Sequence, residues 1–384
     1  RDRGKASINY NNSFRFDSPL NMPEMMDSYT WAKYMNDASV GSGAGVWFTD
    51  EKLEQIKKAQ SDPTMQKMFK NSNNRWEVWD NTPLLPLGNT DWLKEQFGTS
   101  FSQEHTLSIN GGDDRLQYYV SGNYLNRGGL LRHGDDSMQR YTMTGKINAQ
   151  ITNWLRMTYN TRFSRKDFDS PGDLINGTDV FFHNMCRYWP ILPTTDPNGN
   201  WLPESYIGRL QNGGRAKNQT DRLSQQLSFV ATPVKGLTLN AELNYRIDTE
   251  FNHRDWQTTY GYDCDNNPFV DSNATSSVYE YSFKSNYFNP NLFAEYSRSF
   301  GEHNMKVMGG FQSEWFRQRN MKAQQNGIMS GLPTLDTTTT KPSVGGAYNS
   351  WTTAGFFGRI NYDYAGRYLF EACLLYTSPS PRDR

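Results

Sequence analysis

Histidine, cysteine and serine are the residue types that most often carry catalysis or bind metals, and their spacing here suits neither role. The five histidines stand singly, with no i, i+4 pair and no H-E-x-x-H motif. The three cysteines form no C-x-x-C pair, and no G-x-S-x-G motif is present. We therefore expect no catalytic residue, no metal site, no cofactor and no enzyme activity.

Two segments rich in Asp and Asn, 196–200 and 263–267, carry oxygen ligands at the alternating spacing that calcium prefers. Neither segment continues with the glycine and the distal glutamate of an EF-hand loop. Asn and Gly tolerate left-handed backbone and are common in turns. Plain turn chemistry is therefore the better interpretation of both segments.

Tryptophan is the residue type whose placement points most directly to binding. Flat indole faces are suited to stacking on sugar rings or packing against a peptide. Six tryptophans lie in segments that we expect to be long loops, and they are the candidate substrate contacts: Trp47, Trp76, Trp79, Trp189, Trp201 and Trp256. Alternatively, these side chains fill the small cores of the loops or contact a partner protein.

We expect strands to connect these loops. Residues 89–166 contain runs of strict polar and apolar alternation, separated by short turns of Gly, Asp and Asn. A period of two residues indicates a strand with two different environments. In residues 116–124, for example, Tyr118, Val120 and Tyr124 fall on one face, and Gln117 and Asn123 on the other. Residues 140–151 and 155–163 repeat the pattern.

The polar face of these strands is too polar and too long to be the solvent face of a short sandwich strand, and the turns alternate between tight and very long, as an outer-membrane β-barrel requires. The composition is compatible with such a barrel. The chain has 384 residues, and its hydrophobic content of 36% is rich in aromatic rings, with 22 Tyr, 22 Phe and 11 Trp. Tyr and Trp suit a membrane interface, and a transmembrane strand needs only about 9–11 alternating residues. A mean hydropathy of -0.82 is compatible with such strands. We expect the apolar side chains, including Tyr118, Tyr124, Tyr141, Tyr159 and Tyr245, to face lipid and the polar ones to face a wet lumen.

Charge argues against nucleic acid as a partner. The 40 basic and 40 acidic residues are interspersed along the sequence and give a formal net charge of zero. We expect no basic stripe that would follow a phosphate backbone.

Long excursions separate some of the strands. The first strand is expected near residues 7–16, and the excursion after it, roughly 17–98, should hold two helices, at 23–38 and from Thr49 or Asp50 to Gln60. Further excursions are expected at about 167–221 and 251–277. Later strands are expected at 223–231, 237–247, 279–288, 291–300, 303–317 and 354–364, so that the chain has about ten to twelve strands in all.

Three segments resemble the barrel of SusC/RagA-type TonB-dependent outer-membrane transporters: residues 89–97, 105–131 and 140–166. The segment GFFGRINYDYAGRYLFEA, residues 355–372, is similar to another recurrent hairpin of that family. The resemblance implies an all-β fold, an antiparallel transmembrane β-barrel fragment of about ten to twelve of 22 strands, with long extracellular loops containing short helices.

The resemblance also implies a function and partners. Such proteins import an oligomeric nutrient, a glycan or a peptide, under a SusD-like lipoprotein lid and with energy from TonB. The expected location is the outer membrane of a Gram-negative, Bacteroidota-like bacterium. Residues 1–372 should then be a partial barrel whose plug domain and signal peptide lie upstream. Residues 373–384 depart from the family pattern and look like translated adapter sequence, so we expect a non-native tail there.

Two alternatives remain open. One is a secreted all-β protein that binds or cleaves glycans with the same aromatic loops, which predicts paired carboxylates converging in a cleft. The other is a barrel that does not transport and serves as an adhesin or as an enzyme scaffold.

Overall fold

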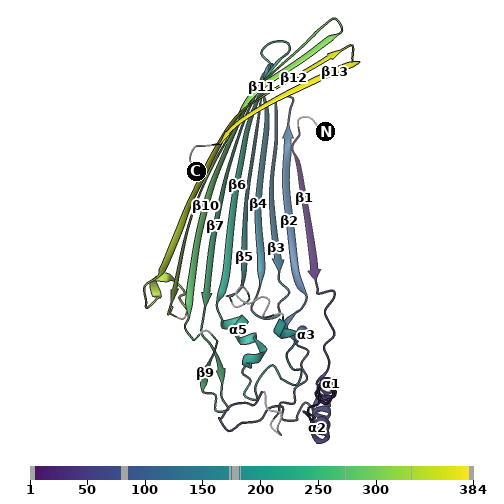
Figure 1. Cartoon of the computed structure of the whole chain (residues 1–384), viewed down its shortest axis with the longest axis vertical. Coiled ribbons are helices and arrows are strands. Elements are labelled where there is room, and N and C mark those ends of the chain that lie inside the picture. The colour runs from purple at the N-terminus through teal and green to yellow at the C-terminus, as the bar shows by residue number, and fades with distance from the viewer. Residues whose placement is uncertain are drawn as a thin grey trace.

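The computed structural model describes residues 5–78, 85–172, 174, 181, 183–272, 274–329 and 331–379, with side chains up to residue 376. Eleven strands form one sheet, and β8 (Thr259–Tyr262) and β9 (Pro268–Ser272) form a separate hairpin. Figure 1 shows the large sheet with its strands in chain order. Its members are β1 (Ser7–Asp17), β2 (Ser100–Gly112), β3 (Leu116–Gly128), β4 (Ser137–Thr152), β5 (Leu155–Pro171), β6 (Arg215–Ala231), β7 (Leu237–Trp256), β10 (Ser277–Phe300), β11 (His303–Asn326), β12 (Ser343–Tyr364) and β13 (Tyr368–Pro379).

Every pairing in this sheet is antiparallel, which confirms the expected antiparallel all-β fold. Its eleven strands lie within the expected range of ten to twelve. The total of 22 strands for a whole barrel stays a prediction.

The pairing register gives the sheet one apolar face and one polar face. Residues paired across neighbouring strands share a face, and one such row runs through Tyr118, Ile147, Tyr159, Leu227 and Leu243. The neighbouring row on the reverse side runs through Tyr119, Lys146, Asn160, Gln226 and Asn244. We call these sides the apolar face and the polar face. The alternation read from the sequence is therefore confirmed across strands as well as along them.

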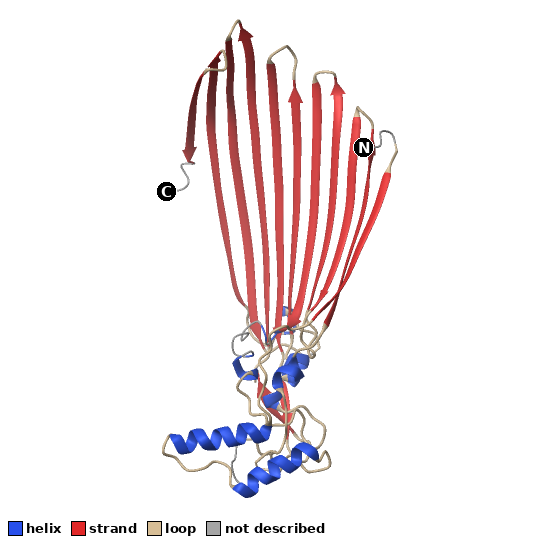
Figure 2. Cartoon of the chain, turned by 90° about the vertical axis from the view of Figure 1, so that its right-hand side faces the viewer, coloured by secondary structure: helices blue, strands red, loops and turns tan. Residues whose placement is uncertain are grey.

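The connections divide by length between the two ends of the sheet. Turns of two to five residues join β2 to β3, β4 to β5, β6 to β7, β10 to β11 and β12 to β13. The long excursions, residues 18–99, 172–214 and 257–276, leave the other end, where Figure 2 shows the helices gathered beyond the strands. The small elements there are α1 (Ser28–Gly41), α2 (Asp50–Ser61), α3 (Trp92–Gln96), η1 (Pro203–Ser205) and α5 (Ile207–Asn212), while η2 (Leu335–Thr337) lies between β11 and β12.

The first predicted helix begins five residues later than expected, at Ser28, and ends at Gly41. Asp27 caps it, because its carboxylate accepts hydrogen bonds from the backbone N–H groups of Tyr29 and Thr30. The second helix has Thr49 as its N-cap, as predicted, and ends at Ser61. Among the described residues, no helix has the length and hydropathy needed to cross a membrane.

Several strand boundaries differ from the predictions. β6 begins at Arg215, eight residues before its predicted start, while β7 ends at Trp256 and β11 at Asn326, each nine residues beyond its predicted end. The predicted strands 279–288 and 291–300 are one strand, β10, whose pairing with β7 continues through Pro290. β12 begins at Ser343, eleven residues before its predicted start. The excursion between β5 and β6 covers residues 172–214 and is shorter than the predicted 167–221.

The last strand includes part of the expected tail. In β13, Cys373 lies opposite Arg359 of β12, and the pairing continues to Pro379. A strand here fits the hairpin expected at 355–372. The non-native origin of residues 373–384 stays a prediction.

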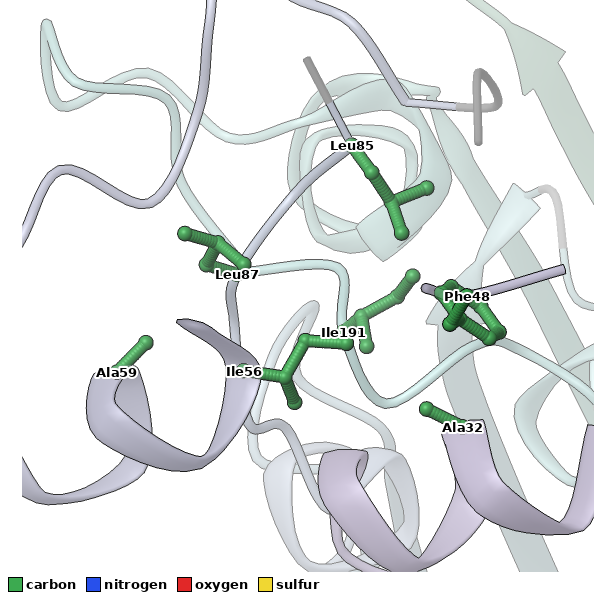
Figure 3. Packing of buried hydrophobic residues seen from close by; sticks show 7 residues of the cluster. All are labelled: Ala32, Phe48, Ile56, Ala59, Leu85, Leu87 and Ile191. Atoms are coloured by element: carbon green, nitrogen blue, oxygen red, sulfur yellow. The ribbon is translucent and has the colours of Figure 1, made fainter. Parts of the chain in front are cut away.

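The excursions have a hydrophobic core of their own (Figure 3). Its buried residues are Ala32, Phe48, Ile56, Ala59, Leu85, Leu87 and Ile191. Ile191 comes from the second excursion and lies beside Ile56 of α2, so this core ties two excursions together. Burying one Ile or Leu side chain contributes about 1.5–3 kcal/mol. A second core contains Trp92, Leu93, Phe181, Met185, Leu192 and Leu210.

Candidate functional site

An aromatic cluster lies on the surface of the first core. The ring of Trp47 is 5.9 Å from that of Trp189, and Trp189 is 5.3 Å from Trp31. Phe48 lies 5.8 Å from Trp31. Trp47 keeps 37% of its surface exposed, so one flat ring of the cluster faces outward. The structure therefore brings together two of the six predicted tryptophans, Trp47 and Trp189.

Asn36 of α1 fixes the Trp47 segment. Its side-chain oxygen accepts hydrogen bonds from the backbone N–H groups of Trp47 and Phe48, both at 2.8 Å. Its side-chain amide donates to the carbonyl oxygen of Phe48 at 2.7 Å. These three hydrogen bonds hold the exposed indole against the helix. Sequence reasoning missed both Asn36 and Trp31, because each looks like an ordinary helix residue.

The other predicted tryptophans lie apart from this cluster. Trp76 forms an isolated bridge with Lys70, and Trp201 lies 5.5 Å from the ring of His133. Trp256 ends β7 and has the guanidinium of Arg254 at 5.8 Å from its ring. All three are half-buried, as expected of residues that fill loop cores. Trp79 lies outside the described residues. A substrate contact for any of the six stays a proposal.

The two Asp- and Asn-rich segments form the turns that the sequence predicted. In each, the first Asp accepts hydrogen bonds from the backbone N–H groups two and four residues later: Asn198 and Asn200 for Asp196, and Asp265 and Asn267 for Asp263. Asn71 repeats the arrangement with Asn73 and Arg75. The fourth residue of each turn has a positive φ: 61° at Asn74, 89° at Gly199 and 64° at Asn266.

These three turns come from three excursions and contact one another. The side-chain amide of Asn74 donates to Asp265 at 2.8 Å, and that of Asn200 donates to Asn266 at 2.9 Å. Hydrogen bonds from Asn267 lower the pKa of Asp263, which keeps the carboxylate charged and bound to its own turn. Within the described ranges, no group of three or more His, Cys, Asp and Glu side chains converges on a point where a metal would bind. The turns therefore hold the excursions together.

Between the turns and the sheet lies a polar contact of the second and third excursions. Arg209 of α5 makes a two-pronged ion pair with Asp271 of β9, at 2.6 Å and 2.8 Å. Glu204 of η1 is close by, and burial raises the pKa of its carboxyl group. One of its carboxyl oxygens is buried and has no hydrogen-bond partner among the described residues. The three excursions thus form one packed assembly that presents the Trp47 cluster.

Comparison with known proteins gives three curated relatives and several solved structures. "TonB-dependent receptor P3" of Formosa agariphila is 25% identical over 73% of this chain and 28% of the relative. "TonB-dependent receptor SusC" of Bacteroides thetaiotaomicron is 23% identical over 77% of this chain and 31% of the relative. The chain thus spans about a third or less of the length of these relatives. No protein-family model matches it.

The fold comparison agrees with the sequence comparison. The RagAB peptide importer in its "closed-closed" state superposes with a TM-score of 0.74 at 18% identity, over 99% of this chain and 43% of that one. The RagAB peptide transporter gives a TM-score of 0.71 over 97% of this chain and 42% of that one. The relatives are named as receptors, and the solved structures as a peptide transporter and a peptide importer. In motifs, relatives and fold, the chain is similar to TonB-dependent receptors of the SusC/RagA type.

Proposed function

We propose that the chain forms wall and outer loops of a TonB-dependent importer that takes up an oligomeric nutrient through the outer membrane of a Bacteroidota-like bacterium. The observation that carries this proposal is the two-faced sheet. Its apolar face continues over all eleven strands, and its long loops leave from one end. A transmembrane barrel needs apolar side chains toward lipid, polar ones toward the lumen and long loops on the outer side.

Exposure of the apolar face favours lipid over water as its surroundings. Met143 is 63% exposed and Phe356 is 62% exposed, and both lie on this face. A large continuous apolar surface of this kind marks a contact with lipid or with another protein. The secreted glycan-binding alternative requires water on this side, so the sheet argues against it.

Import implies further parts and partners. On this proposal, residues 1–372 are a partial barrel, an upstream plug contacts TonB, and a SusD-like lipoprotein covers the outer loops. The substrate is a glycan or a peptide. Trp47 and Trp189, and with less structural support Trp76, Trp79, Trp201 and Trp256, are the candidate substrate contacts. The indole of Trp47 supports this role best, because it is the most exposed member of the aromatic cluster.

Long-read sequencing of the natural gene around these residues tests the proposal. We expect a signal peptide and a plug domain upstream, about ten further alternating strands in place of residues 373–384, and a lid-lipoprotein gene next to it. A short secretory leader directly before residue 1 and a stop codon soon after residue 384 would contradict it and favour the secreted glycan-binding protein.

A further inference from the structure

The polar face of four adjacent strands is unevenly charged. Over the fully described strands β3 to β6, this face carries seven cationic side chains and no carboxylate. They are Arg127, Arg140, Lys146, Arg156, Arg162, Lys166 and Arg222, and we call them the cationic strip. The whole chain has zero net charge, and from its interspersed charges we expected no basic stripe. That expectation was wrong because the register gathers every second residue of four strands on one surface.

Few of these cations are neutralised. Arg140 pairs with Glu104 of β2 at 3.2 Å, and Arg222 pairs with Asp248 of β7 at 2.5 Å. The side chains of Arg162 and Lys166 make no hydrogen bond or ion pair with any described residue. Arg140 also lies directly opposite Lys166 in the sheet, and like charges in such a pair repel each other. The other five cations of the strip make no ion pair with a described residue, so they are available to bind an anion.

The strip runs along the strands, from the end that carries the long loops to the end that carries the short turns. On β5 alone, Lys166, Arg162 and Arg156 follow one another at intervals of four and six residues, roughly 13 Å and 20 Å. Its middle lines one side of a groove of about 840 Å³ with Arg140, Arg162, Lys166 and Arg222. Asp221 of β6, and Asp248 and Glu250 of β7, also line this groove, so the free cations lie on the β4 and β5 side. Cations spaced along the direction of transport suit a solute that moves past them better than a static contact.

Aromatic rings beside the strip indicate the chemistry of this solute. The adjoining groove, of about 640 Å³, brings Tyr119 and Tyr287 together with Lys146 and Arg162. Rings that can stack on sugars, next to cations that bind carboxylates, suit a sugar acid. We propose that the cationic strip makes the importer selective for acidic oligosaccharides, that is, chains that contain uronic acid residues. This inference rests on the proposed import function and specifies its substrate class.

The test compares Arg162→Gln/Lys166→Gln with the unaltered chain, expressed with the natural flanking sequence of its gene and purified in detergent. Neither residue has a partner among the described residues, so the double variant removes two charges with little effect on packing. The matched control is Lys235→Gln/Arg367→Gln, which removes two charges from the short turns after β6 and β12. The probes are hexagalacturonate, the neutral hexamer maltohexaose, and hexaglutamate.

We expect hexagalacturonate to bind the unaltered chain, and the double variant to raise its Kd about tenfold while the control leaves it unchanged. Raising salt from about 0.05 M to about 0.5 M should weaken binding of the acid and not of maltohexaose. Equal binding of both sugar hexamers, or equal binding by variant and control, overturns the proposal. Tighter binding of hexaglutamate overturns the assignment to sugars.

Uptake assays in cells distinguish an error in the proposed selectivity of the cationic strip from an error in the proposed import function. If only the strip is wrong, cells take up an oligomer through the receptor, and the double variant does not change their preference for acidic chains. If the proposed import function is wrong, deleting the gene leaves the uptake of every tested oligomer unchanged, even where the purified protein binds one of them. An acidic protein segment resting on the strip would make the double variant less stable and leave probe selectivity unchanged, which also contradicts the proposal.

Discussion

The side-chain amide of Asn289 donates a hydrogen bond to the backbone oxygen of Ser313 across 2.9 Å. The register of β10 and β11 places Pro290 opposite Ser313, where proline has no N–H to donate. Asn289 is buried, with 8% of its surface exposed, and its side-chain oxygen in turn accepts from Asn244 of β7 at 3.3 Å. A side chain thus supplies the bond that the backbone cannot, and β10 continues through the proline.

Replacing Asn289 with Ala should therefore destabilise the sheet. The carbonyl of Ser313 would lose its partner in a buried position, at a cost of about 1–3 kcal/mol. Chemical denaturation of the protein in detergent measures this loss. Asn291→Ala is the matched control, because the Asn291 side chain makes no hydrogen bond with described residues. Equal loss in the two variants would show that the Asn289 bond has no special role.

Truncating Trp47 should weaken substrate capture without unfolding the loops. Its ring is exposed, and its backbone N–H is held by Asn36 whatever side chain the position carries. Once growth assays identify the nutrient, we expect Trp47→Ala to raise the concentration needed for half-maximal uptake about tenfold, or about 1.4 kcal/mol. Trp154→Ala is the control, since this indole is also exposed, at 48%, and lies in the short turn after β4. A Trp47 variant that matches this control would remove Trp47 from the proposed site.

Glu204 should make the loop assembly less stable as pH rises. Burial raises its folded-state pKa above the ordinary 4.5, so the folded protein holds this proton more firmly than the unfolded chain. The stabilisation is full below about pH 4.5 and is lost as pH rises through the folded-state pKa. Glu204→Gln should raise the Tm at pH 7, and the gain should vanish near pH 4. The exposed Glu54→Gln provides the control; a pH-independent difference would contradict the account.

Much of the fold could be predicted from the sequence, because alternation of period two is a local property. The two faces of β3, β4 and β5, the helix after Thr49 and the turns at Asp196 and Asp263 all follow from residues near one another in the chain. The break predicted at Pro290 was wrong, because Asn289 compensates for the proline by a hydrogen bond to the neighbouring strand, which a pattern along one strand does not show.

The candidate site was less predictable, since it depends on contacts between distant segments. Trp47 and Trp189 meet because Ile191 packs beside Ile56, and no local pattern records that contact. The clamp by Asn36 needs the Trp47 segment to fold back on α1. The cationic strip likewise appears only when the register of four strands is known.

In the proposed barrel, the apolar face contacts lipid and the polar face does not. Nitroxide labels on β4 test it most directly, in the protein reconstituted in a bilayer with Cys186, Cys264 and Cys373 replaced by Ser. Single cysteines are introduced for labelling at Met143, Thr144, Lys146, Ile147 and Asn148. The account predicts that labels at positions 143 and 147 collide freely with oxygen and hardly with a water-soluble nickel chelate, while labels at 144, 146 and 148 lack this lipid signature. Nickel collisions as frequent at 143 and 147 as at 144, 146 and 148 would contradict the membrane-barrel account.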